Sequence, residues 1–382
     1  MTRHPACRNK AKGSLGGLLL LSPLLFGLLL LVAARPAAAQ ETLSLVATPL
    51  PQPYELPDNL RWAGGLALTS SDSRLGGISG MGAGLAPPIS DAGLSMIAVT
   101  DSGTLLRGDL VFETEPQIML TDVYQRKLTV EWLTDARTGL RARQAESLTS
   151  WNERLAFGFE VNHRVGVMHR GTQISNLPVP TALRGLKVQN HGIEALATLP
   201  DGSLLAISEG VEREGGLRAW IYDGRGDDWR VLVYEWDQSF APTGADITPD
   251  GRFLVVSERK FVSMREPLSN RLMVIPVEDI SADSRLSPVQ IIDLDPVLGA
   301  VANVEAVTIL PTADPEEFLI LIATDNNYIT LLPTMIQSKQ IIYTTLTVLN
   351  DMLINTNFCS IFYRLRLRKR SYFSRTNFGF MK

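Results

Sequence analysis

Apolar and polar positions alternate in short runs along this chain, and the runs recur with a period near 50 residues. The clearest copies are NHGIEALATLPDGSLLAISEG at 190–210 and APTGADITPDGRFLVVSERKF at 241–261. In each copy two apolar runs flank an Asp-Gly turn, which favours a β-hairpin because glycine tolerates a positive φ. Further β-rich runs follow each hairpin and bring the repeat to roughly four strands. The pattern predicts an all-β fold, a β-propeller of five or six four-stranded blades.

Acidic residues occupy repeated places in these copies. Glu160, Glu209 and Glu258 end second apolar runs at intervals of 49 residues, and other copies end at Asp101 and Asp325. First strands of propeller blades line the central channel, so equivalent positions from several blades converge on one axis. The predicted acidic channel site consists of Asp101, Glu146, Glu160, Glu194, Glu209, Glu258, Arg259 and Glu305.

Converging carboxylates repel one another, and this raises their pKa values unless a cation neutralises them. Calcium suits such a site, because it takes six to eight oxygen ligands in flexible geometry. The predicted metal ligands are Glu194, Glu209, Glu258, Glu305, Asp325 and Asn326. The alternative is that each acid caps its own strand or pairs with a neighbour such as Arg259 or His191.

Other catalytic chemistry has weaker support in the sequence. The four histidines have neither the HExxH spacing nor the paired cysteines of a zinc site. No G-x-S-x-G motif is present, and Ser79 in GISGM fits a first-strand turn better than a nucleophile. The pattern therefore disfavours a serine esterase.

The first 39 residues have the pattern of a secretory signal peptide. A basic stretch precedes an apolar run from Leu15 to Ala34, and three alanines precede Gln40. Cleavage after Ala39 would release a periplasmic or secreted protein with no stable membrane span, and a retained anchor is the alternative. Cys7 and Cys359 are the only cysteines, so the body between them contains no disulfide.

The charge is unevenly distributed. Residues 40–328 hold 23 of the 36 Lys and Arg residues and 39 of the 40 Asp and Glu residues, a net charge of −16. Such a surface repels nucleic acid and anionic lipid and attracts cations. A nucleic-acid partner is therefore not expected.

Residues 329–382 differ in composition from the body at 40–328. They contain no Ala or Glu and only one Gly and one Pro, and they are rich in Ile, Leu, Thr, Asn, Phe and Tyr. The abrupt change is typical of frameshifted or foreign sequence, without a periodicity that predicts a packed element. A basic peptide for an acidic partner is the alternative.

Several ordered motifs give the chain a resemblance to a known family. GGISGM, AESLTS, NHGIEAL, APTGADITPDGRFLVVSERKF, NVEAVTI and ATDNNY resemble the successive signatures of the phytase-like, "esterase-like activity of phytase" family of exported β-propeller proteins. The resemblance runs from about Leu60 to Tyr328. In that family a Gln-Arg-Thr-Leu-Leu strand usually follows the last motif, but here Tyr328 leads into ITLLP. We therefore expect the closing strand to be lost or replaced, although a segment around Leu66 to Thr69 can supply an outer strand.

The resemblance implies hydrolysis of a small anionic ester or phosphoester, assisted by calcium that bridges the acidic site and the substrate. The alternative is a non-catalytic propeller that binds a ligand or a protein at its channel mouth, since fold does not settle function.

Overall fold

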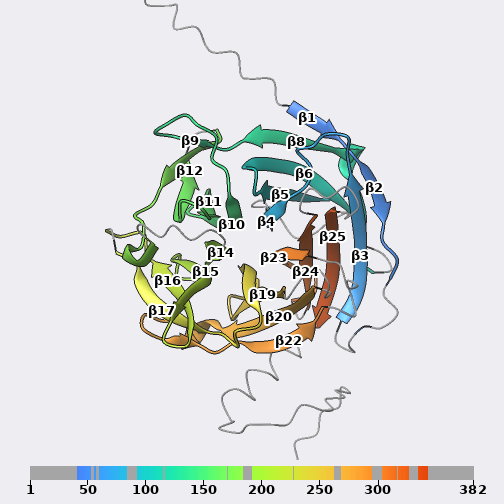
Figure 1. Ribbon diagram of the computed structural model, residues 1–382. Coiled ribbons are helices and arrows are strands. Elements are labelled where there is room, and N and C mark those ends of the chain that lie inside the picture. Colours follow the sequence, from blue (N-terminus) through green and yellow to red (C-terminus); the bar gives the residue numbers. More distant parts are fainter. Residues whose placement is uncertain are drawn as a thin grey trace, which may run out of the picture. The chain divides into compact units, whose positions relative to one another are not determined.

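Short strands joined by tight turns make up the fold, as the alternating pattern predicts. The computed structural model describes residues 41–52, 56, 60–83, 93–114, 117–169, 171–183, 192–226, 228–261, 268–294, 303–315, 317–326 and 334–342 (Figure 1). Among them there is no α-helix, only the 3-10 turns η1 (Tyr124–Arg126), η2 (Thr181–Leu183) and η3 (Val277–Asp279). All described residues belong to the unit Glu41–Lys382, and the predicted signal peptide lies outside them.

The described strands form four sheets, and we divide the largest, of 11 strands, into two units at the parallel pairing of Gly64 with Leu120. The resulting five units, in which most pairings are antiparallel, are called blades. The first holds β4 (Ile78–Ala83), β5 (Leu94–Thr100), β6 (Thr104–Glu113), β7 (Met119–Val123), β8 (Lys127–Trp132) and β1 (Glu41–Ser44). The second holds β10 (Ala145–Trp151), β11 (Arg154–Phe159), β12 (Arg164–Met168), β13 (Gln173–Asn176) and β9 (Thr134–Asp135). The third holds β14 (Ile193–Thr198), β15 (Leu204–Arg213), β16 (Gly216–Tyr222), β17 (Arg230–Glu235) and β21 (Arg285–Leu286). The fourth holds β18 (Ala241–Ile247), β19 (Phe253–Lys260), β20 (Ser269–Pro276) and β22 (Val289–Asp293). The fifth holds β23 (Asn303–Pro311), β24 (Glu317–Asp325), β25 (Thr334–Ile342), β3 (Leu60–Thr69) and β2 (Val46–Pro49).

The first strands of these blades lie side by side around one axis. Each first strand contacts the next: β4 contacts β10, β10 contacts β14, β14 contacts β18, β18 contacts β23, and β23 contacts β4. Figure 1 shows β4, β10, β14 and β23 on the inside, with β8, β17 and β22 on the outside. The chain is an all-β propeller, and its first strands form the channel wall.

Small residues allow the first strands to approach closely at the axis. The residues in equivalent places are Gly80, Ser147, Ala195, Gly244 and Ala306. A Cβ added to Gly80 would lie 2.9 Å from the backbone nitrogen of Leu148, and one on Gly244 would lie 3.2 Å from that of Val307. Larger side chains at these glycines would therefore push neighbouring blades apart.

The hydrophobic core is divided among the spaces between successive blades. Trp220 and Val165 belong to a buried cluster between the second and third blades, and Tyr234 and Val256 belong to one between the third and fourth. Each of these side chains is at most 1% exposed. Each blade buries both faces, so the strands read as continuous apolar runs as well as alternating ones.

The fifth blade combines strands from both ends of the described chain. β3 supplies its outer part, as predicted, and β25 lies between β24 and β3 with antiparallel pairing to both. The expectation that the closing strand is lost is therefore wrong, and its alternative, replacement from the atypical segment 329–382, describes the fold. The backbone of β25 supplies the ladder hydrogen bonds, which depend less on side-chain identity than core packing does.

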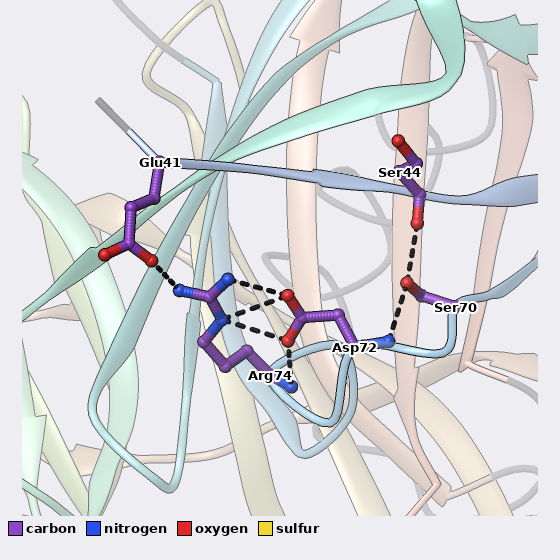
Figure 2. A network of polar contacts seen from close by, with 5 residues as sticks. All are labelled: Glu41, Ser44, Ser70, Asp72 and Arg74. Carbon is purple, nitrogen blue, oxygen red and sulfur yellow. Dashed lines mark hydrogen bonds and ion pairs between the residues drawn. The ribbon is translucent and has the colours of Figure 1, made fainter. Parts of the chain in front are cut away.

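A polar network fastens the outer strand β1 to the loop that follows β3 (Figure 2). Arg74 forms ion pairs with Glu41 and with Asp72, the latter at 2.6 Å. The Ser70 hydroxyl donates a hydrogen bond of 2.6 Å to the carbonyl of Ser44. This loop leads directly into β4, so the network also fixes the start of the first blade.

Candidate functional site

The site begins with a β-bulge near the start of the first strand in each blade. Between the paired residues on either side of the bulge, one extra residue has no direct partner on the neighbouring strand. These extra residues are Ser79, Glu146, Glu194, Thr243 and Glu305. A bulge re-aims the side chain of its extra residue, and its repetition in every blade directs five side chains to one end of the axis.

A second set of five residues lies opposite the residue two places before each bulge. The amide groups of Asp101, Glu160 and Glu209 donate to the carbonyls of Gly77, Gln144 and Gly192. Arg259 is paired with Ala241, and Asp325 is paired with Asn303. The two sets together place seven carboxylates and one guanidinium around the axis, and we call them the axial cluster: Ser79, Asp101, Glu146, Glu160, Glu194, Glu209, Thr243, Arg259, Glu305 and Asp325.

Glu258 does not belong to the axial cluster, and its prediction as a metal ligand is wrong. It is paired with Pro242, one place before Arg259, and only 1% of its side chain is exposed. Its carboxylate accepts hydrogen bonds of 2.6 Å from the Tyr234 hydroxyl and 2.5 Å from Arg271 Nε. Neighbouring residues of a strand point to opposite faces, so a shift of one place moves the side chain away from the axis.

Three carboxylates of the axial cluster come close enough to share one ion. Carboxylate oxygens of Glu160, Glu194 and Glu209 all lie within 4.8 Å of one another. Glu160 is 8% exposed and Glu194 is 7% exposed. Glu194 receives no hydrogen bond or ion pair from any described residue, so its buried charge has no partner in contact. Carboxylate oxygens are the donors that calcium prefers, and this donor set fits that ion.

Arg259 lies on the other side of the cluster. Its guanidinium forms an ion pair of 3.2 Å with Glu209 and a second, closer one with Glu305. It also donates a hydrogen bond of 2.7 Å to Asn303 Oδ1. Glu305 was predicted as a metal ligand, but the structure gives it an arginine partner instead. Glu209 links the two sides of the axial cluster, because it contacts Arg259 and also belongs to the triad of Glu160, Glu194 and Glu209.

The electrostatics of the cluster follow from this excess of acids. Burial, then the charges of Glu146 and Glu209, raises the pKa of Glu194 well above its ordinary value. Burial, then the charge of Glu160, raises the pKa of Glu146 in the same way. Burial raises the pKa of Glu305 to about 8, although Arg259 offsets part of the effect. The cluster therefore takes up positive charge, either as protons or as a cation.

Two predicted residues lie at the junction of the fifth and first blades. Asn326 Oδ1 accepts a hydrogen bond of 3.2 Å from the Gly77 amide, so this predicted ligand links two blades. The charge of Asp325 raises the pKa values of Glu146 and Glu305. His191, the alternative partner, lies outside the described residues.

Beneath the acids, small and apolar side chains line a small cavity on the axis. Ser79, Ser147 and Glu305 are its polar lining residues, and Met81, Leu148 and Val307 contribute apolar surface. Within the described lining, charge is confined to Glu305, at the acidic end. Throughout the described part of the chain, no helix has the length and apolar character needed to cross a membrane.

Comparison with known families identifies the group to which the chain belongs. The profile of the phytase-like family, described as "esterase-like activity of phytase", matches residues 73–328. The chain belongs to the phytase-like family. The match covers all five bulges and every acid of the axial cluster, so the cluster lies within the part that the family shares. None of the curated proteins compared with the chain matches it.

Several solved structures are similar at low identity. A protein of unknown function from Dyadobacter fermentans DSM 18053 is 10% identical, with a TM-score of 0.40, over 79% of this chain and 96% of its own. The β-propeller domain of Cps50 (Swd1) from Myceliophteria thermophila is 11% identical, with a TM-score of 0.32, over 78% of this chain and 99% of its own. An endo-arabinase from Bacteroides thetaiotaomicron VPI-5482 is 10% identical, with a TM-score of 0.37, over 66% of this chain and 94% of its own.

Sequence reasoning found most acids of the cluster but missed parts of its frame. For Ser79 the sequence predicts a first-strand turn and not a place at the axis, and it gives no prediction for Thr243 or Asn303. Each of the three can be found by applying one rule to every copy of the repeat, namely the place of the bulge and the place two residues before it.

Proposed function

We propose that the protein is a hydrolase of ester or phosphoester bonds that acts at the axial cluster with calcium. The observation that carries the proposal is the triad of Glu160, Glu194 and Glu209, in which the buried Glu194 has no hydrogen bond or ion pair with a described residue. Membership of a family described by esterase-like activity of phytase supports the reaction class.

Glu160, Glu194 and Glu209 would hold the ion, each through a carboxylate oxygen. Calcium there supplies a positive charge that attracts an anionic ester and polarises the bond to be cleaved. Without such a charge, a body of net charge −16 repels an anionic substrate. The sign of the surface charge therefore agrees with a metal-assisted reaction.

Glu146 and Arg259 have roles other than binding the ion. Glu146 has a pKa raised by burial and by its acidic neighbours, so its carboxyl group holds a proton at higher pH than an ordinary glutamate. A protonated carboxyl group beside the mouth can transfer its proton to a departing alkoxide, which makes Glu146 our candidate general acid. Arg259 keeps Glu209 and Glu305 in place through its two ion pairs.

The experiment is hydrolysis of p-nitrophenyl phosphate and p-nitrophenyl acetate by the purified protein, with calcium and with chelator. We expect turnover in calcium, its loss in chelator, and a loss of at least tenfold in Glu194→Gln. Glu212→Gln is the matched control, because Glu212 is an exposed acid on β15, the strand that also carries Glu209. If turnover is absent or insensitive to both chelator and Glu194→Gln, the hydrolase proposal fails and a binding propeller becomes the better interpretation.

We also propose that the protein is exported to the periplasm or secreted, on the basis of the leader pattern in residues 1–39. Sequencing of the N-terminus of the mature protein tests this proposal. A start at Gln40 supports it, and an intact leader in the membrane fraction contradicts it.

A further inference from the structure

The fourth blade departs from the others at the axis. It places Thr243 at the bulge and Arg259 at the strand end, and it is the one blade that contributes no acid to the axial cluster. The first blade contributes Asp101, and the second, third and fifth each contribute two acids. The fourth blade therefore places the guanidinium of Arg259 where the other blades place a carboxylate.

Arg259 occupies only one side of the cluster. It contacts Glu209, Glu305 and Asn303, which belong to the third and fifth blades on either side of the fourth. The charge of Arg259 acts on Glu194 from a distance, without an ion pair within the described residues.

Glu194 provides the second observation. Its side chain is 7% exposed, its carboxylate lies within 4.8 Å of two other acids, and the described residues give it no hydrogen bond or ion pair. Glu305 has comparable burial, at 9% exposed, but it is paired with Arg259. Glu194 and Glu305, two of the three bulge glutamates, therefore differ in whether a described residue supplies a contacting cation.

We propose that Arg259 takes the place of a divalent cation on the Glu209–Glu305 side and so confines calcium binding to the Glu160–Glu194–Glu209 side. This inference rests on the calcium site proposed above and goes beyond it by assigning one ion per chain and the residue that sets this number. Arg259 is a specificity-determining residue, because a fixed guanidinium excludes a second cation from its own position by repulsion.

The test is calcium binding to the full chain, measured as bound ions after equilibrium dialysis and as affinity by calorimetry. We expect one calcium ion per chain in the wild type and two in Arg259→Gln. The second ion should disappear when Glu305→Gln is added to Arg259→Gln. Arg259→Lys keeps a positive charge and should bind one ion. Arg285→Gln, which removes a charge from an exposed ion pair with Glu235, is the control for net charge and should also bind one ion.

The outcomes separate this inference from the proposed function. One ion in both wild type and Arg259→Gln overturns the role of Arg259 and leaves the calcium site standing. If the wild type binds no calcium, the calcium site of the proposed function fails. In that case a first ion gained by Arg259→Gln supports the role of Arg259, and no gain overturns it.

A second comparison keeps the inference testable if Arg259→Gln does not fold. With Arg259 intact, Glu194→Gln should weaken calcium binding at least thirtyfold, whereas Glu305→Gln should change it by less than threefold. Equal weakening by the two variants would show that the ion contacts both sides, and it would overturn the confinement.

Discussion

Replacement of Glu194 by Gln should stabilise the protein in chelator and should make it less stable than the wild type when calcium is added. Glu194 is buried, and its carboxylate lies within 4.8 Å of Glu160 and Glu209 with no cationic side chain of the described part of the chain in contact. At an effective dielectric constant near 20, two ionised carboxylates at that distance repel by about 3 kcal/mol. Gln is nearly isosteric with Glu and removes the charge, so in chelator we expect the variant to unfold at a higher temperature than the wild type.

The magnitude follows from the structure and the size of the domain. Protonation relieves part of the repulsion, so the net stabilisation should be about 1–3 kcal/mol near pH 8. For a domain of this size each kcal/mol shifts the melting temperature by about 2–4 °C. Calcium at roughly 100 times the wild-type Kd adds about 2.7 kcal/mol to the wild type and about 0.9 kcal/mol to a variant that binds about thirtyfold more weakly. The difference of about 1.8 kcal/mol is enough to cancel or reverse a stabilisation of that size.

The assay is thermal unfolding by circular dichroism, in chelator and in a calcium series, with Glu212→Gln as the control. The control should follow the wild type under both conditions. The reasoning is refuted if Glu194→Gln is less stable than the wild type in chelator and calcium leaves both melting temperatures unchanged. That result would make Glu194 a structural residue whose carboxylate supports the bulge.

Four further outcomes are expected. In chelator, the stability of the wild type should fall as pH rises from about 5 through about 8. Folding raises the pKa values of Glu146, Glu194 and Glu305 above the ordinary 4.5, so the folded state loses its extra protons over this range. Denaturant unfolding at several pH values measures the effect, and a rise in stability with pH would contradict it. Gly80→Ala should destabilise the fold by about 1–3 kcal/mol, because its Cβ would meet the backbone of β10. Gly82→Ala on the same strand, whose Cβ would have its nearest neighbour at 3.9 Å, should be close to neutral in the same unfolding experiment. A chain shortened to residue 328 should be less soluble than the full chain, since it exposes the edges of β24 and β3; equal solubility and melting temperature would show that β25 adds nothing.

The sequence predicts the blades well because local rules determine them. The Asp-Gly turns at Gly202 and Gly251 adopt the positive φ values, 84° and 74°, that a tight hairpin turn requires. The apolar runs on either side become β14 with β15 and β18 with β19. Hairpins depend on residues close in the chain, so the repeat in the sequence is enough to locate them.

The closing strand could not be predicted from composition. Thr334–Ile342 lies in the segment that differs from the rest of the chain, yet it pairs with β24 and β3. The two neighbouring strands expose unpaired amide and carbonyl groups at a fixed spacing, and a range of extended segments can satisfy them. Side-chain periodicity alone does not reveal that these backbone groups need a pairing strand.

The pairing register explains both the error at Glu258 and the role proposed for Arg259. A spacing of 49 residues relates Glu160 to Glu209 and also Glu209 to Glu258, but the fourth blade reaches its strand end one residue later. Alternation of side chains then buries Glu258 against Tyr234 and Arg271 and brings Arg259 to the axis. A strictly repeated set of acids would place ten carboxylates there, and the chain has seven with one guanidinium. Thr243 and Arg259 together lower the repulsion on one side, and on the other side Glu194 has no hydrogen bond or ion pair with a described residue. The asymmetry of one blade thus determines where an added cation has most to stabilise.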